Sequence, residues 1–383
     1  MRIGIDGRGY GSTYGYMGKY AEALVTHISK HTDAHEYVLF VHDQELNPSI
    51  LNCPRLQVIT IPTGLWKLGN HLYFTYELYR AKLDAMLFME PKIPVFYAKK
   101  SIIIVPDLLS YFYPSKHAHV FWARHMEMFF LRRSIRKASH IITLSKTLKR
   151  DLIEIFNIHE DLITHIPPIY VPLRIWKAVT AKNFFAQEHL HEKYILSVWE
   201  LREYKNIPRL LRAYHSLLEQ EKIDMDLVLV GKEDVSYHEI RSIVISLGLQ
   251  NRVHIYNMID EETMHALYTH ASLYILSSLY EGSEQAIIEP LVYNLPIASA
   301  SLPSLTTALE KDTLVTWFRP MSVPDITDAC KRILTSDIRT YASVDLSEYS
   351  PSVICAKLLE VFTLCAWQNA TQKMNTEAKN ANL

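Results

Sequence analysis

The chain has 383 residues, of which 49% are apolar, and its formal net charge is −1. This length exceeds one ordinary hydrophobic core, so we expect a globular protein with two domains. The balanced charge argues against a protein that binds nucleic acid through bulk electrostatics, and no apolar run approaches the roughly 20 residues of a membrane-spanning helix.

The first residues, MRIGIDGRG, lead directly into a strand-like run, so we expect no signal peptide and a cytoplasmic protein. The cysteines lie far apart and lack the spacing of metal ligands; they are Cys53, Cys330, Cys355 and Cys365. This distribution predicts buried free thiols in a reducing compartment.

Short β-rich runs alternate with amphipathic helical segments over the first part of the chain. The runs are RIGID, YVLFVH, LQVITIP, AMLFM, SIIIV and HIITLS, and the helical segments include HLYFTYELYRAKL and FWARHMEMFFLRRSIRKA. The alternation stops at HIPPIYVPLRIWKAVTAKNFFAQ, where prolines and the absence of a clean period predict a linker.

The same alternation returns with YILSVWE, DLVLVG, VHIYN, LYILSS and PIASA. We expect Pro208 in the first turn of one helix, Asp260 as the cap of another and Gly248 as the stop of a third. The two series predict an α/β protein with two doubly wound, Rossmann-like domains. The predicted segments are a first domain over residues 1–168, a linker over 169–192 and a second domain over 193–350. A terminal helix over 351–367 and a disordered tail over 368–383 follow.

Two carboxylates follow the apolar run LYILSS: Glu281 lies just past its end, and Glu289 follows with seven residues between them. Doubly wound domains bind ligands at the carboxyl ends of their strands. A carboxylate there can reach a polyol, and one on the following helix can accept hydrogen bonds from a ribose diol. Gly282 permits close approach of the backbone, and the helix start offers N–H groups to a phosphate. The spacing alone leaves a helix with two solvated acids equally open.

Together with two other stretches, this region resembles the retaining glycosyltransferases of family 4, which have the two-domain GT-B fold. The strongest likeness covers Leu227 to Ala300 and includes a glutamate–seven residues–glutamate signature at Glu281 and Glu289. SVWELREYKNIPRLLRAY is similar to the segment that carries a diphosphate-binding lysine, here Lys205. MRIGIDGRGYGSTYGYMGKY is similar to the first strand and glycine loop of the family, with Gly18 before Lys19.

The resemblance implies two domains that face a cleft, the first binding the acceptor and the second the donor, with a final helix that crosses back. The implied reaction moves a hexose, as in mannosyltransferases, from a nucleoside diphosphate to a saccharide or lipid-linked saccharide with retention, in surface glycan synthesis. No metal or further cofactor is implied. The implied catalytic residues are Glu281, Lys205 and Asp107, and the implied donor-binding residues are Glu289, Gly282, Ser283, Glu284, Arg202 and Gly18.

By this analogy, Glu289 would hold the ribose, Glu281 the donor sugar and Lys205 the diphosphate. The chain departs from the family at three places. Pro106 and Asp107 stand where a His-Asp pair is usual, Gly-Ser-Glu follows Glu281 in place of Gly-Phe-Gly, and the usual arginine is absent, which leaves Arg202 as the nearby candidate. Two other functions therefore stay open: a nucleotide-sugar isomerase and a non-catalytic donor-binding protein.

Three other patterns suggest sites but have simpler interpretations. Asp224 and Asp226 match a metal–nucleotide pattern at the amino end of a strand, where we expect a solvated turn. His189 and His191 lack a third ligand and are predicted to be surface histidines. The loop GRGYG at residues 7–11 either lines the cleft or is a plain turn.

The segment HVFWARHMEMFFLRRSIRKA mixes aromatic residues with several cations. Such a face can rest on an anionic membrane, which would suit a lipid-linked acceptor and place the protein at the inner face of the membrane. The favoured alternative is an aromatic stripe that faces the core, with a solvated basic side.

Overall fold

The computed structural model describes most of the chain. The described residues are 1–11, 15–30, 34–42, 46, 48–62, 67–113, 121–170, 190, 193–198, 202–231, 237–257, 259–309, 314–335 and 345–365. Most of the predicted linker, both histidines of the 189–191 pattern and the predicted tail lie outside them.

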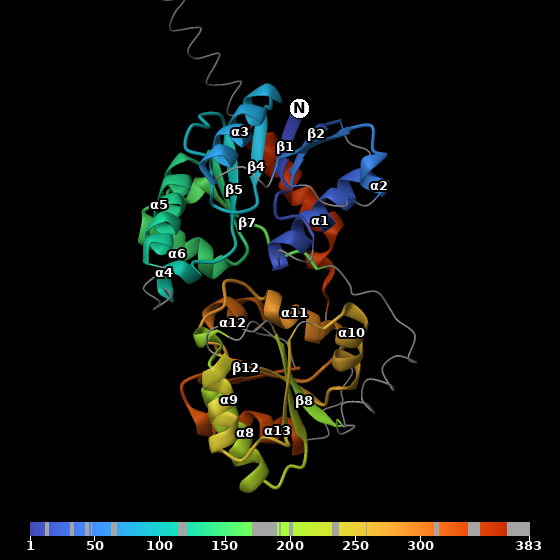
Figure 1. The fold of residues 1–383 in the computed structure, drawn as a ribbon, viewed down its shortest axis with the longest axis vertical. Coiled ribbons are helices and arrows are strands. Elements are labelled where there is room, and N and C mark those ends of the chain that lie inside the picture. Colours follow the sequence, from blue (N-terminus) through green and yellow to red (C-terminus); the bar gives the residue numbers. More distant parts are fainter. Residues whose placement is uncertain are drawn as a thin grey trace, which may run out of the picture. The chain divides into compact units, whose positions relative to one another are not determined.

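The chain forms two compact units (Figure 1). Unit 1 comprises Met1–Val171 together with Ser347–Leu383, and unit 2 comprises Pro172–Leu346. Unit 1 is therefore built from two separate stretches of the chain, whereas unit 2 is one continuous stretch.

Unit 1 contains a parallel sheet in the order β3-β2-β1-β4-β5-β6-β7. The strand order reverses between β1 and β4, because the chain first builds outward to β3 and then returns to the other side of β1. The strands are β1 (Arg2–Asp6), β2 (Glu36–Val41), β3 (Leu56–Thr60), β4 (Ala85–Phe88), β5 (Ser101–Val105), β6 (His140–Thr143) and β7 (Ile163–His165).

Helices cover both faces of this sheet, because successive strand residues point to opposite sides. Ile102 packs in a core with α1 (Gly15–Lys30), and its neighbour Ile103 packs in a second core with α3, α5 and α6. The remaining elements of the unit are α2 (Pro48–Leu51), α3 (Lys67–Arg80), α4 (Leu109–Phe112), α5 (Phe121–Lys137), α6 (Lys146–Phe156), η3 (Glu160–Leu162) and η5 (Ser347–Tyr349).

A terminal helix over residues 351–365 belongs to the core of unit 1, where it lies beside α1 (Figure 1). Ile354, Leu358 and Phe362 recur at helical spacing and are at most 2% exposed. Full burial of one such side chain contributes about 1.5–3 kcal/mol. The cysteine thiols of this helix are buried as well.

Unit 2 contains a parallel sheet in the order β10-β9-β8-β11-β12-β13, and its order reverses between β8 and β11. The strands are β8 (Tyr194–Val198), β9 (Asp226–Val230), β10 (Val253–Tyr256), β11 (Leu273–Leu276), β12 (Ile297–Ala300) and β13 (Val315–Phe318). The helices are η4 (Glu203–Lys205), α8 (Ile207–Glu219), α9 (Tyr237–Ser246), α10 (Glu261–His270), α11 (Gln285–Val292), α12 (Pro303–Leu309) and α13 (Val323–Thr335). Two doubly wound, parallel-sheet units were predicted, and this prediction is confirmed.

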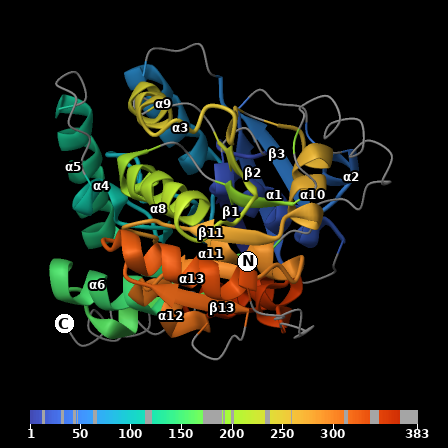
Figure 2. The same ribbon diagram turned by 90° about the horizontal axis from the view of Figure 1, so that it is seen from below.

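Local signals set several helix ends in unit 2. Asp260 accepts a hydrogen bond from Thr263 N at 2.7 Å and so caps α10, and Gly248 follows α9 with a φ of 68°. Pro208 is the second residue of α8. The helices α8 and α13 lie side by side on the sheet, and Thr327 Oγ1 of α13 donates to Ala213 O of α8 (Figure 2).

Candidate functional site

Lys205 and Glu281 meet at the carboxyl edge of the sheet in unit 2. Lys205 ends η4, which follows β8, and Glu281 follows β11, so the two residues flank the point where the strand order reverses. Lys205 Nζ lies 2.6 Å from Glu281 Oε1, and the side chains are only 8% and 12% exposed. Such a position is where doubly wound sheets bind ligands.

Hydrogen bonds between the two loops fix the positions of this pair. Ser277 Oγ donates to Lys205 O at 2.8 Å, and Leu279 N donates to Tyr204 O at 2.7 Å. Asn206, whose φ of 60° lies in the left-handed region, donates through Nδ2 to Ser277 O. The loop after β8 is thus attached to the loop after β11, and both side chains start from anchored backbone.

The Lys205–Glu281 contact changes what each charge can do. A buried ammonium group beside a buried carboxylate is already neutralised, and removing either partner leaves an uncompensated charge. A ligand phosphate can therefore reach Lys205 in two ways: through a further N–H of the ammonium group, or by replacing Glu281. Sequence reasoning placed the two residues in one site but did not anticipate that they pair with each other.

Glu289 has a different partner on the neighbouring helix. Its Oε2 accepts a hydrogen bond of 3.0 Å from the hydroxyl group of Tyr268 in α10. The ring of Tyr268 is stacked on that of Tyr293, with centroids 5.1 Å apart and planes 15° apart, and Tyr293 Oη lies 2.8 Å from His265 Nδ1. Burial, followed by the charge of Glu289, raises the pKa of Tyr268 well above its usual value, so this hydroxyl stays protonated and donates.

The segment between Glu281 and Glu289 contains two buried polar residues. Ser283 and Glu284 are 8% and 3% exposed, and Glu284 is the N-cap residue of α11. The helix begins at Gln285, so Pro290 lies inside it. Proline has no N–H to donate, and the hydroxyl of Tyr274 lies 3.3 Å from Ala286 O, the carbonyl that Pro290 would otherwise bond.

The other predicted site residues lie apart from this pair. Arg202 is exposed directly before η4. Asp107 belongs to unit 1, where it follows β5 and accepts a hydrogen bond from Leu109 N at 2.8 Å. Gly18 also belongs to unit 1, in α1, where an added Cβ would lie 2.0 Å from Gly11 O. The close approach of the glycine loop to α1 thus requires Gly18, and Asp107 holds the start of α4.

Asp226 requires a correction, because we expected Asp224 and Asp226 to lie in a solvated turn. Asp224 is indeed exposed, but Asp226 is 2% exposed and begins β9. Arg252 Nε lies 3.1 Å from Asp226 Oδ1, and His254 Nε2 lies 3.2 Å from its Oδ2. The pairing of β9 with the segment that leads into β10 supplies these partners. Asp226 is the first residue of β9, so it lies at the amino edge of the sheet, as predicted.

Sequence reasoning missed Tyr268 and Tyr293. Each directly follows a pair of apolar residues, where an aromatic residue predicts core packing, and nothing local shows that one hydroxyl meets a carboxylate. In the part of the chain that the structure describes, no group of three His, Cys, Asp or Glu side chains could hold a metal ion. Within the same residues, no helix is both long and apolar enough to cross a membrane.

The segment that carries this site is similar to known glycosyl transferases. Residues 180–350 match the model of the family described as glycosyl transferases group 1. The chain is 25% identical over 212 residues to the uncharacterized glycosyltransferase MJ1607 of Methanocaldococcus jannaschii, covering 53% of this chain and 52% of that protein. It is 23% identical over 220 residues to the O-antigen chain mannosyltransferase RfbU of Salmonella typhimurium, covering 56% of each. The chain thus spans about half the length of the curated relatives it matches.

Solved structures extend the likeness to both units as a fold. WaaG, a glycosyltransferase involved in lipopolysaccharide biosynthesis, gives a TM-score of 0.69 at 12% identity and covers 93% of this chain and 98% of its own. Anabaena HepE, in complex with UDP and glucose, gives a TM-score of 0.66 at 14% identity and covers 98% of this chain and 100% of its own. At these identities the likeness shows the fold alone, which is GT-B. Lys205, Glu281 and Glu289 all lie within residues 180–350, the stretch that matches the model of glycosyl transferases group 1.

Proposed function

We propose that the protein transfers a sugar, with retention at the anomeric carbon, from a nucleoside diphosphate donor to a saccharide or lipid-linked saccharide acceptor in surface glycan synthesis. The buried Lys205–Glu281 pair at the order reversal of unit 2 carries this proposal. The names of similar proteins support it, since RfbU is a mannosyltransferase of the O-antigen chain and HepE has been solved with UDP-glucose. A mannosyl donor is the finer proposal.

The charge on the leaving diphosphate explains the choice of residues. As the glycosidic bond to the donor breaks, negative charge grows on the phosphate oxygens, and a fixed cation stabilises that state most. Lys205 supplies the cation in place of a metal ion, and backbone N–H groups at the start of α11 add to it. Arg202 is the nearest further cation along the chain.

In this scheme, a change of partner at Lys205 couples binding of the diphosphate to binding of the donor sugar. The diphosphate replaces the carboxylate of Glu281 as the partner of Lys205, and Glu281 is then released toward the hydroxyl groups of the donor sugar. Glu289 holds the ribose diol throughout. Asp107, as a catalytic residue, and Gly18, as a donor-binding residue, complete the roles proposed from the resemblance.

The test of this function is turnover with matched controls. Purified protein is incubated with nucleotide sugars, with and without saccharide acceptors, and free diphosphate and glycosylated product are both measured. Product that forms only with acceptor supports the proposal. Conversion of the donor without acceptor indicates the isomerase instead, and affinity for the nucleotide sugar without any turnover indicates a binding protein.

We also propose a peripheral contact of unit 1 with anionic membrane, which would bring the protein to a lipid-linked acceptor. Three elements form the surface: α3, residues 93–98 and α5. Tyr79 Oη of α3 donates to Phe96 O at 3.2 Å and accepts from Ala98 N at 2.9 Å, and Arg133 of α5 donates to Val95 O. These bonds join the elements side by side.

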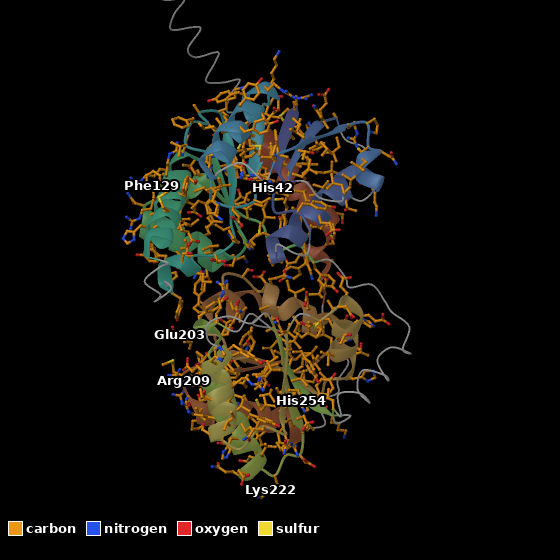
Figure 3. The ribbon with its side chains drawn as sticks, viewed as in Figure 1. His42, Phe129, Glu203, Arg209, Lys222 and His254 are labelled. Atoms are coloured by element: carbon orange, nitrogen blue, oxygen red, sulfur yellow. The ribbon has the colours of Figure 1, made fainter. Side chains whose placement is uncertain are left out.

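This surface combines exposed apolar rings with cations. Tyr76, Phe96 and Phe129 are 60%, 65% and 51% exposed, and Phe129 lies at the outer side of α5 (Figure 3). A hollow on α5 is lined by His125, Met128, Phe129, Arg132, Arg133, Arg136 and Lys137. Aromatic rings suit the interfacial layer of a bilayer, and each cation near anionic lipid contributes about 1 kcal/mol.

Charge reversal tests the membrane contact. The double variant Arg132→Glu, Arg136→Glu should lower recovery with anionic liposomes at least tenfold, and salt should weaken binding of the unaltered protein. The matched control, Arg212→Glu with Lys222→Glu, makes the same change of net charge on exposed residues of unit 2 and should bind as before. Equal recovery with neutral and anionic liposomes would leave α5 as an ordinary solvated helix.

A further inference from the structure

We propose that Tyr268 is a positioning residue that fixes the carboxylate of Glu289 for the ribose diol of the donor. This inference rests on the proposed function, in which Glu289 holds that diol. Tyr268 occupies one carboxylate oxygen, Oε2, through a 3.0 Å hydrogen bond. The bond leaves Oε1 as the oxygen that is presented to the ligand.

The position of the tyrosine hydroxyl is set by its surroundings. Tyr268 is 2% exposed in α10, and its ring neighbours those of Tyr293 and Tyr274, whose centroids are 5.1 and 6.1 Å away. Tyr293 is held in turn by His265 Nδ1, and Tyr274 lies within 3.3 Å of two backbone carbonyls. The hydroxyl of Tyr268 therefore has little freedom to move with the side chain of Glu289.

The protonation state of Tyr268 fixes which residue donates the hydrogen bond to the other. Burial and the nearby carboxylate raise the pKa of Tyr268 well above its usual value, so its hydroxyl stays protonated and donates to Glu289. A glutamate on a helix surface otherwise samples several rotamers, and fixing one of them costs free energy on ligand binding. Tyr268 removes that cost before the nucleotide arrives.

The experiment compares two nucleotides on one variant. The ribonucleoside diphosphate among ADP, GDP and UDP that most stabilises the unaltered protein is titrated by calorimetry, beside its 2′,3′-dideoxy form. Tyr268→Phe should weaken binding of the ribonucleotide about five- to tenfold, as expected for loss of one oriented hydrogen bond, and should change binding of the dideoxy form less than twofold. In turnover, KM for the donor should rise while kcat holds, because the diol contact is equal in ground and transition states.

Two further variants separate positioning from folding. Tyr214→Phe removes a buried hydroxyl of the same unit that donates to Met225 O, remote from Glu289 in its contacts, and should change neither affinity. Tyr293→Phe keeps the stacked ring but loses the contact with His265, and should give a smaller loss confined to the ribonucleotide. If Tyr268→Phe does not fold, Tyr293→Phe carries the test.

The outcomes are distinct. Equal losses for both nucleotides, or no loss for either, would overturn the positioning role of Tyr268 and leave the glycosyl transfer proposal intact. If the unaltered protein binds the ribonucleotide and its dideoxy form equally, Glu289 does not hold the diol, and the fault lies in the proposed donor site itself.

Discussion

Each unit carries an ion pair at the carboxyl end of its first strand, but the two pairs are built differently. In unit 1, Arg8 makes two parallel 2.8 Å bonds to both oxygens of Asp6, two residues away, and its guanidinium lies 3.8 Å from the centre of the Phe74 ring. In unit 2, the structure shows one 2.6 Å contact between Lys205 and Glu281, which are 76 residues apart.

The difference separates a structural pair from an exchangeable one. Arg8 binds both carboxylate oxygens of Asp6, two residues away, and its guanidinium group lies against the ring of Phe74. A lysine is a compact cation with three rotatable donors, and here it contacts one oxygen of its partner. A competing anion can therefore displace Glu281 far more easily than it can displace Asp6, and this contrast supports the proposal that the diphosphate binds in unit 2.

The largest expected effect comes from removing the two cations in turn. Lys205→Ala should lower kcat/KM by about 10²–10³-fold, since a cation that faces growing negative charge is lost, and should also weaken diphosphate binding. Arg8→Ala should destabilise the protein, because Asp6 loses its partner, yet keep affinity for the diphosphate. Initial rates, calorimetry and melting curves measure the two effects. Loss of diphosphate affinity in Arg8→Ala equal to that in Lys205→Ala would erase the contrast between the pairs.

A smaller effect is expected from neutralising the carboxylates in turn, and here the affinity for the diphosphate should increase rather than decrease. Glu281→Gln keeps the shape of the side chain but frees the charge of Lys205, so affinity for the diphosphate should rise by about threefold to tenfold while turnover falls. Asp6→Asn is the matched change in unit 1 and should leave that affinity as it was. A fall in affinity for Glu281→Gln would mean that Glu281 assists the diphosphate rather than competing with it.

The smallest effect on turnover is expected from chelation of metal ions. If Lys205 supplies the charge that neutralises the leaving diphosphate, turnover in excess EDTA should equal turnover without it. The measurement is the initial rate before and after chelation, followed by readdition of magnesium or manganese. Loss with EDTA and recovery with either metal would assign part of the neutralising charge to a metal ion and would reduce the role of the exchangeable pair.

The sequence predicts the architecture well because its signals are local. Apolar runs such as LYILSS, the cap at Asp260 and the stop at Gly248 act over a few residues, and they suffice to place β11, α10 and α9. The alternation of such runs then limits the fold to doubly wound units. The order of strands within each sheet follows from packing and cannot be read from any one run.

The candidate site is predicted in part, for the same reason. Glu281, Glu289 and Lys205 can be singled out by spacing and resemblance, but their partners come from other elements. Tyr268 reaches Glu289 from α10, and Arg252, directly before the neighbouring strand, contacts the buried Asp226. Contacts of this kind depend on which strands and helices become neighbours, and a pattern along the chain does not encode that directly.

The terminal helix over residues 351–365 has a consequence for biosynthesis. Unit 2 is continuous in the chain, so it can complete its core as soon as its last strand and helix have left the ribosome. Unit 1 is synthesised first, but one face of its sheet lacks Ile354, Leu358 and Phe362 until the helix emerges. The part made first is thus finished last. During that interval the apolar face is open to chaperones and to aggregation, and a nonsense mutation after unit 2 would leave it uncovered for good.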